Sequence, residues 1–221
     1  MRYLPWSVLL PLGLIASASN AQSPVPQARL IDALKQNRLS LTMSDGRPAG
    51  PGWDWLVREA RDARFTLIGE EHGVAETAQL AAALFTAVRG AGYSRFAIEL
   101  SPVIAQDIET AGRHNGLQGI ADFLTAPGTF TFYNLREEAQ FLADVINAAP
   151  RGERVLWGFD REIFSDRYLI AKLESRVPPR AREAFARLKG ASTSAWASGN
   201  VFTMSQDPAV VSAVRAAWPN P

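Results

Sequence analysis

Three short runs of strand-forming residues, separated by helical patterns, most constrain the fold of this 221-residue chain. The runs cover 65–68, 95–98 and 154–159, and each is followed by a carboxylate, namely Glu70, Glu99 and Asp160. Strands that alternate with helices favour right-handed crossovers between parallel neighbours. We therefore expect an α/β fold with a parallel sheet and helices on both faces, in three layers.

Apolar residues spaced three and four positions apart, together with helix-start signals, predict the helices. We expect helices over 28–37, 53–63, 77–90, from Ser101 onward, over 134–149, 167–176 and 180–189, and from Asp207 onward. Ser101-Pro102 is typical of the N-cap and first helical position, and Asn134 with Glu137 of a capping box. Residues 46–52 read as a loop. Residues 112–134, with a short helix at 120–124, form either a lid or a plain surface excursion.

The N-terminal residues have the pattern of a secretory signal peptide. One positive charge at Arg2 precedes an apolar run over 7–18 that ends in small residues, which predicts cleavage after Ala21, with Ala18 as the alternative. The run is shorter than the roughly 20 residues that span a bilayer. We expect export to a periplasm or the cell exterior, no membrane contact after cleavage, a leader with a short helix over 22–52, and one α/β domain over 53–221.

Composition excludes several classes of site. The chain has no cysteine, so it forms no disulfide, thiolate metal site, Cys nucleophile or lipoprotein anchor. With 23 basic and 22 acidic residues and no long run of either sign, nothing favours nucleic acid as a partner. G-x-S-x-G, phosphate-loop and dinucleotide motifs are absent from the sequence, which disfavours serine hydrolases, kinases and dehydrogenases. A small-molecule substrate remains.

The candidate site is the turn after the first predicted strand. Strand ends of a parallel sheet meet at one edge, where ligands bind in open α/β folds. His72 lies two residues beyond Glu70 in a glycine-bounded turn, where a histidine can act as general base and a carboxylate can orient its ring. A surface histidine and ordinary helix caps are the alternative. Glu76 either faces the same cleft or, as we favour, complements a helix dipole.

Metal binding is a weaker interpretation of the same residues. Glu70, His72 and Glu99 could hold a divalent cation, but their spacing matches no established metal motif. We therefore assign no metal. The only other histidine, His114, has no motif around it and receives no role.

The segment 53–161 resembles the erythromycin esterase family and its wider superfamily, which includes the ChaN-type haem-binding lipoproteins. The similarity is carried by the sequences Phe-Thr-Leu-Ile-Gly-Glu-Glu-His-Gly at 65–73, Phe-Ala-Ile-Glu at 96–99 and Trp-Gly-Phe-Asp at 157–160. The resemblance implies opening of a lactone ring without a serine nucleophile. His72 would activate water with Glu70 as partner, Glu99 and Asp160 would line the cleft, and Arg161 would contact the oxyanion or substrate.

Three functions remain open. The first is an exported hydrolase of an ester or lactone that needs no cofactor. The second is a protein that binds haem or another iron ligand, for which His72, Tyr133 and Phe132 are candidate contacts. The third is a folded remnant without activity. The esterase relatives are considerably longer, so we also expect that the predicted sheet is incomplete and that self-association could complete it.

Overall fold

The computed structural model describes residues 27–69, 71–128, 133, 135–160, 165–199 and 207–219. The chain divides into two compact units, residues 1–39 and residues 40–221. The predicted signal peptide and its cleavage site lie outside the described residues. None of the described helices combines the length and the apolar character needed to cross a membrane.

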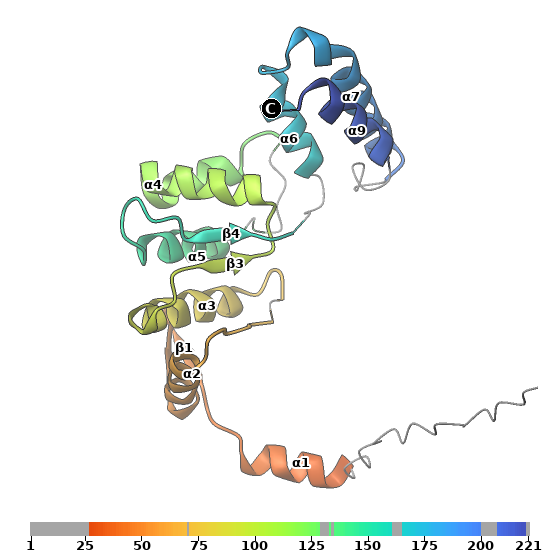
Figure 1. Ribbon diagram of the computed structural model, residues 1–221. Coiled ribbons are helices and arrows are strands. Elements are labelled where there is room, and N and C mark those ends of the chain that lie inside the picture. The colour runs from red at the N-terminus through yellow and green to blue at the C-terminus, as the bar shows by residue number, and fades with distance from the viewer. Residues whose placement is uncertain are drawn as a thin grey trace, which may run out of the picture. The chain divides into compact units, whose positions relative to one another are not determined.

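Most of the described residues are helical, as Figure 1 shows. The first unit contains helix α1 (Gln27–Gln36). The helices of the second unit are α2 (Pro51–Asp62), α3 (Ala75–Val88), α4 (Pro102–Leu124), α5 (Arg136–Asn147), α6 (Ser165–Glu174), α7 (Arg182–Ala197) and α9 (Pro208–Ala217), with the short 3₁₀ helices η1 (Arg89–Ala91) and η2 (Pro179–Ala181). The strands are β1 (Thr42–Ser44), β2 (Arg47–Ala49), β3 (Phe96–Ile98) and β4 (Leu156–Gly158).

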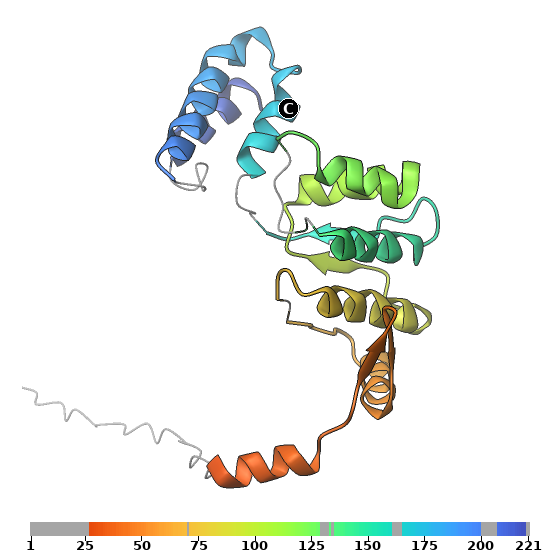
Figure 2. The same cartoon turned by 180° about the vertical axis from the view of Figure 1, so that it is seen from behind.

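The described strands form two sheets of two strands each, so the prediction of a three-layer parallel sheet is wrong. The first predicted strand, at 65–68, is not part of either sheet. Phe65 is 76% exposed and Leu67 is 95% exposed, so these side chains do not enter the core. In both views α3, and not this segment, is drawn next to β3 (Figures 1 and 2). An apolar run becomes a strand only where another strand satisfies its backbone groups.

The second and third predicted strands do pair, as β3 and β4. They are parallel, with Phe96 opposite Leu156 and Ile98 opposite Gly158, and α4 and α5 form the crossover between them. Helix α5 covers one face of this pair (Figures 1 and 2), where its Phe141 ring lies 5.3 Å from the Phe96 ring. The other face exposes Trp157, at 58%. Among the described residues, helices therefore cover only one face of the sheet.

The predicted helices are present, with some changes at their ends. Ser101 Oγ accepts a hydrogen bond from the backbone N–H of Ile104 at 3.3 Å, which confirms the predicted cap of α4. At the start of α5 the capping carboxylate belongs to Glu138 instead of Glu137: its Oε2 accepts from the N–H of Leu135 at 2.8 Å. Asn134, the predicted cap, lies outside the described residues.

Two predicted loops are partly helix or strand. Residues 112–124 belong to α4, which kinks at Asn115 and Gly116, and Ile120 is completely buried in the core. Residues 112–124 are therefore neither a lid nor a surface excursion. The predicted loop 46–52 contains β2 and the start of α2, because a tight turn at Asp45 and Gly46, both with positive φ, makes a hairpin with β1.

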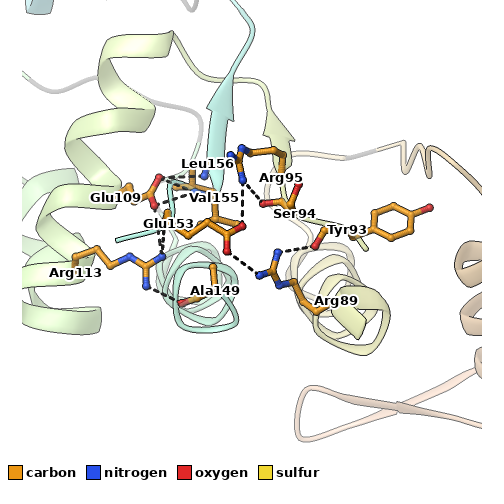
Figure 3. A network of polar contacts seen from close by, with 10 residues as sticks. All are labelled: Arg89, Tyr93, Ser94, Arg95, Glu109, Arg113, Ala149, Glu153, Val155 and Leu156. Atoms are coloured by element: carbon orange, nitrogen blue, oxygen red, sulfur yellow. Dashed lines mark hydrogen bonds and ion pairs between the residues drawn. The ribbon is translucent and has the colours of Figure 1, made fainter. Parts of the chain in front are cut away.

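A buried carboxylate joins α4 to the beginning of β4 (Figure 3). Glu109 is 5% exposed, and its two oxygens accept hydrogen bonds from the N–H of Val155 at 3.0 Å and of Leu156 at 3.1 Å. Arg113, one turn further along α4, lies 3.6 Å from the same carboxylate and donates to the carbonyls of Ala149 and Glu153. The buried charge is therefore compensated by a cation and two donors.

The same network continues from β4 to β3 and to the end of α3. The Glu153 carboxylate pairs with Arg89 at 3.3 Å and with Arg95 at 3.1 Å, and Arg89 also donates to the carbonyl of Tyr93 at 2.6 Å (Figure 3). Arg89 follows α3, whereas Arg95 directly precedes β3. The turn before β4 is thus tied to α3, β3 and α4 together.

Helix α6 contacts α4 through polar side chains. The hydroxyl of Tyr168 donates to Asp107 Oδ2 at 2.7 Å, and Lys172 forms an ion pair with the same carboxylate. Burial, and then the hydrogen bond and charge of Asp107, raise the pKa of the Tyr168 phenol well above its usual range. The folded protein therefore favours the protonated phenol.

We predict that Glu109→Gln lowers the free energy of unfolding by about 2–3 kcal/mol, since an amide cannot replace a carboxylate that accepts two backbone hydrogen bonds and pairs with Arg113. Urea denaturation measures the change. Glu183→Gln is the matched control: its ion pair with Arg187 is exposed and should change stability by less than about 0.5 kcal/mol. Equal stability of the two variants would contradict a structural role for Glu109.

We also predict an alkaline loss of stability that depends on Tyr168. The pKa of the Tyr168 phenol is raised in the folded protein, so folding favours the protonated phenol. The stabilisation that this gives is complete below the unfolded pKa of about 10 and is lost as pH rises above it. Denaturation at pH 8 and pH 11 should show a smaller loss for Tyr168→Phe than for the wild type. An identical loss of stability in both proteins would mean that folding does not raise the pKa of Tyr168.

Candidate functional site

His72 lies in a tight turn between the extended segment 65–69 and α3. The backbone N–H of Val74 donates to the carbonyl of Glu71 at 3.3 Å, which closes the turn. Gly73, the third residue of this turn, has a φ of +80°, which glycine adopts freely and other residues adopt only with strain. The glycine after His72 therefore sets the path of the chain that carries the imidazole.

The imidazole of His72 lies beside the carboxylate of Glu99. His72 Nε2 is 3.5 Å from Glu99 Oε2, and the two side chains are 40% and 36% exposed. Glu99 directly follows β3, so the carboxyl end of that strand positions it. The sequence placed Glu70 beside His72 and Glu99 elsewhere in the cleft; the structure brings Glu99 to the histidine, while Glu70 lies outside the described residues.

Tyr133 contacts the same imidazole from the protein interior. Its ring centroid is 6.2 Å from that of His72 with an interplanar angle of 89°, and Tyr133 is only 3% exposed. The sequence suggested Tyr133 only as a haem contact. No local pattern could have linked it to His72, because the two residues are far apart in the chain and meet only through packing.

Asp160 lies at the same edge of the sheet as Glu99. Its backbone N–H donates to the carbonyl of Leu100, the residue after Glu99, at 3.1 Å. Gly158 permits this close approach, since a Cβ there would lie 2.5 Å from the carbonyl oxygens of Leu100 and Ser101. The structure therefore brings the backbone of Asp160 to the end of β3, next to the residue that follows Glu99.

The other predicted site residues are either peripheral or outside the described residues. Glu76 is exposed in the first turn of α3, a position that favours its interaction with the helix dipole. Arg161 and Phe132, like Glu70, lie outside the described residues. His114 is exposed on α4. Within the described ranges, no three His, Asp or Glu side chains converge closely enough to hold a metal ion.

The side chains of His72 and Glu99 are partly exposed, at 40% and 36%. Two cavities in the described part of the chain, of about 310 and 610 Å³, lie along α2 and between α6 and α7, and neither is lined by His72 or Glu99. Water and a substrate can reach the half-exposed imidazole directly. A histidine next to a carboxylate can accept a proton from water, because the carboxylate stabilises the imidazolium that forms.

We predict that Gly73→Ala lowers the free energy of unfolding by about 1–2 kcal/mol, because alanine is strained at positive φ. A new methyl group would meet no atom within 4 Å, so backbone strain alone causes the loss. Gly90→Ala is the control, since it too has open space but no positive φ. Denaturant titration of both variants measures the difference, and a neutral Gly73→Ala would contradict the turn geometry.

Comparisons of this chain with protein-family models, with curated proteins and with solved structures found no match.

Proposed function

We propose that this protein is a hydrolase of an ester or lactone, in which His72 activates a water molecule and Glu99 supports the histidine. The observation that carries the proposal is the 3.5 Å separation between His72 Nε2 and Glu99 Oε2 at the carboxyl end of β3. A half-exposed imidazole paired with a carboxylate is the arrangement that general-base catalysis requires. The sequence suggested Glu70 as the partner of His72; Glu70 lies outside the described residues, and the proposal rests on Glu99, which the structure places beside the imidazole.

The chemistry needs no covalent intermediate. The imidazole takes a proton from water while the water oxygen attacks the carbonyl carbon of the substrate. The tetrahedral intermediate then collapses, its carbon–oxygen bond to the leaving group breaks, and the imidazolium returns the proton to the departing alkoxide. Glu99 stabilises the imidazolium between these two steps.

Further residues support this function. Asp160 lies beside the residue that follows Glu99 and would contact polar groups of the substrate at the same edge. Arg161 comes next in the chain, and its charge would stabilise the negative oxygen of the tetrahedral intermediate. The resemblance of 65–73, 96–99 and 157–160 to erythromycin esterases favours a lactone among ester substrates. The signal-peptide pattern favours a reaction outside the cytoplasm.

We predict that His72→Ala lowers kcat by about 10²- to 10⁴-fold, the usual contribution of a general base. Glu99→Gln should lower kcat by roughly 10- to 150-fold, which corresponds to the loss of a charged partner for the imidazolium. The measurement is hydrolysis of a panel of simple aryl esters and lactones, macrolides included, by the purified protein. His114→Ala is the matched control, because this second histidine is exposed on α4 and should retain wild-type turnover.

Circular dichroism must show equal folding of all variants. Unchanged turnover in folded His72→Ala would remove His72 as the base. A folded wild-type protein without turnover on any ester or lactone would refute the hydrolase proposal itself.

A further inference from the structure

We propose that Tyr133 is a positioning residue that holds the imidazole of His72 in the orientation needed for catalysis; this inference rests on the hydrolase function proposed above. The Tyr133 and His72 rings meet edge to face, with centroids 6.2 Å apart and planes at 89°. Tyr133 is 3% exposed, whereas the His72 side chain is 40% exposed. A buried ring therefore contacts a partly exposed one.

A row of aromatic rings connects Tyr133 to the core of the second unit. The Tyr133 ring lies 6.3 Å from that of Phe141 on α5, with planes at 25°. Phe141 in turn meets Phe96 on β3 at 5.3 Å, and Phe96 meets Phe85 on α3 at 5.4 Å. Helices α3 and α5 and strand β3 thus all contribute to the position of Tyr133.

The same row positions both neighbours of His72. Phe96 begins β3 and Glu99 directly follows that strand, so β3 carries Glu99 and, through Phe96 and Phe141, also contacts the row that ends at Tyr133. His72 itself lies in a turn with half of its side chain in solvent. The core therefore contacts the imidazole from outside the turn, through Tyr133.

Glu99 by itself leaves the imidazole plane undetermined. A contact at 3.5 Å restrains the distance of one nitrogen from the carboxylate, but the ring can still rotate about its bond to Cβ. Edge-to-face contact with a second ring favours one plane. Because general-base catalysis depends on the direction of the accepting nitrogen, restraint of this rotation should appear in kcat.

The first test needs no variant and no substrate. The chain has only two histidines and four tyrosines, so their ring protons can be assigned separately by NMR. At this separation we expect a nuclear Overhauser effect between the ring protons of His72 and Tyr133. Its absence in the folded wild-type protein would overturn the inference.

The second test compares two substitutions of Tyr133. Tyr133→Leu removes the ring, and we expect kcat to fall about 5- to 10-fold with KM unchanged within about 2-fold, a loss typical of one aromatic pair. Tyr133→Phe keeps the ring and should recover kcat to within about 2-fold of the wild type. The ring resonances of His72 should shift in the leucine variant and remain in place in the phenylalanine variant.

Phe123→Leu is the matched control. Phe123 packs edge to face against Tyr168 at 5.8 Å, so the substitution removes a similar aromatic pair that has no contact with His72. It should lower stability without moving the His72 resonances or changing the ratio of kcat to KM. If Tyr133→Leu does not fold, the inference is tested by the Overhauser effect in the wild-type protein and by the kcat and His72 resonances of Tyr133→Phe.

The outcomes separate this inference from the proposed function. Wild-type hydrolysis with unchanged kcat and unmoved His72 resonances in Tyr133→Leu would overturn the positioning role and leave the hydrolase intact. A wild-type protein without hydrolysis, but with the Overhauser effect and the expected shift in Tyr133→Leu, would support the positioning of His72 and refute the hydrolase.

Discussion

The buried carboxylate of Glu109 is the interaction on which the rest of the second unit depends. It accepts the N–H groups of Val155 and Leu156 where β4 begins, and so replaces the hydrogen bonds that a further strand would supply there. It joins α4 directly to the strand that the crossover leads to. Arg113 compensates the charge and also binds two carbonyls of the turn before β4. A side chain of helix α4 thus satisfies backbone N–H groups at the beginning of β4, which helps a sheet of only two strands to be stable.

This arrangement places the candidate site. With β4 held against α4, its end passes so close to Leu100 and Ser101 that only glycine fits at position 158, and Asp160 comes to lie next to the end of β3. Glu99 and Asp160 then share one edge of the sheet. His72 reaches this edge from a turn whose path Gly73 sets, and the aromatic row from Phe85 to Tyr133 defines its inner side. Local turn geometry and long-range packing therefore meet at the imidazole.

Local sequence patterns predicted the elements better than their assembly. The helices follow from apolar periodicity and from caps such as Ser101 and Asp207, which act within one turn of the chain. The run at 65–68 shows the limit of such patterns. Its residues favour a strand, yet Phe65 and Leu67 are exposed and no described strand pairs with them. Strand propensity describes a residue's fit to a pleated surface and does not provide a neighbouring strand.

The sequence by itself determined the helical segments and the parallel pairing of the second and third strands through a helical crossover, and it indicated His72, in a glycine-bounded turn, as the candidate site. Only the tertiary structure decided that one face of the sheet is open, that Glu99 lies beside His72, and that Tyr133 contacts the imidazole. The physical reason is range: periodicity, caps and turns depend on residues a few positions apart, whereas the partners of His72 come from segments that only the packing of α3, α5 and β3 brings together.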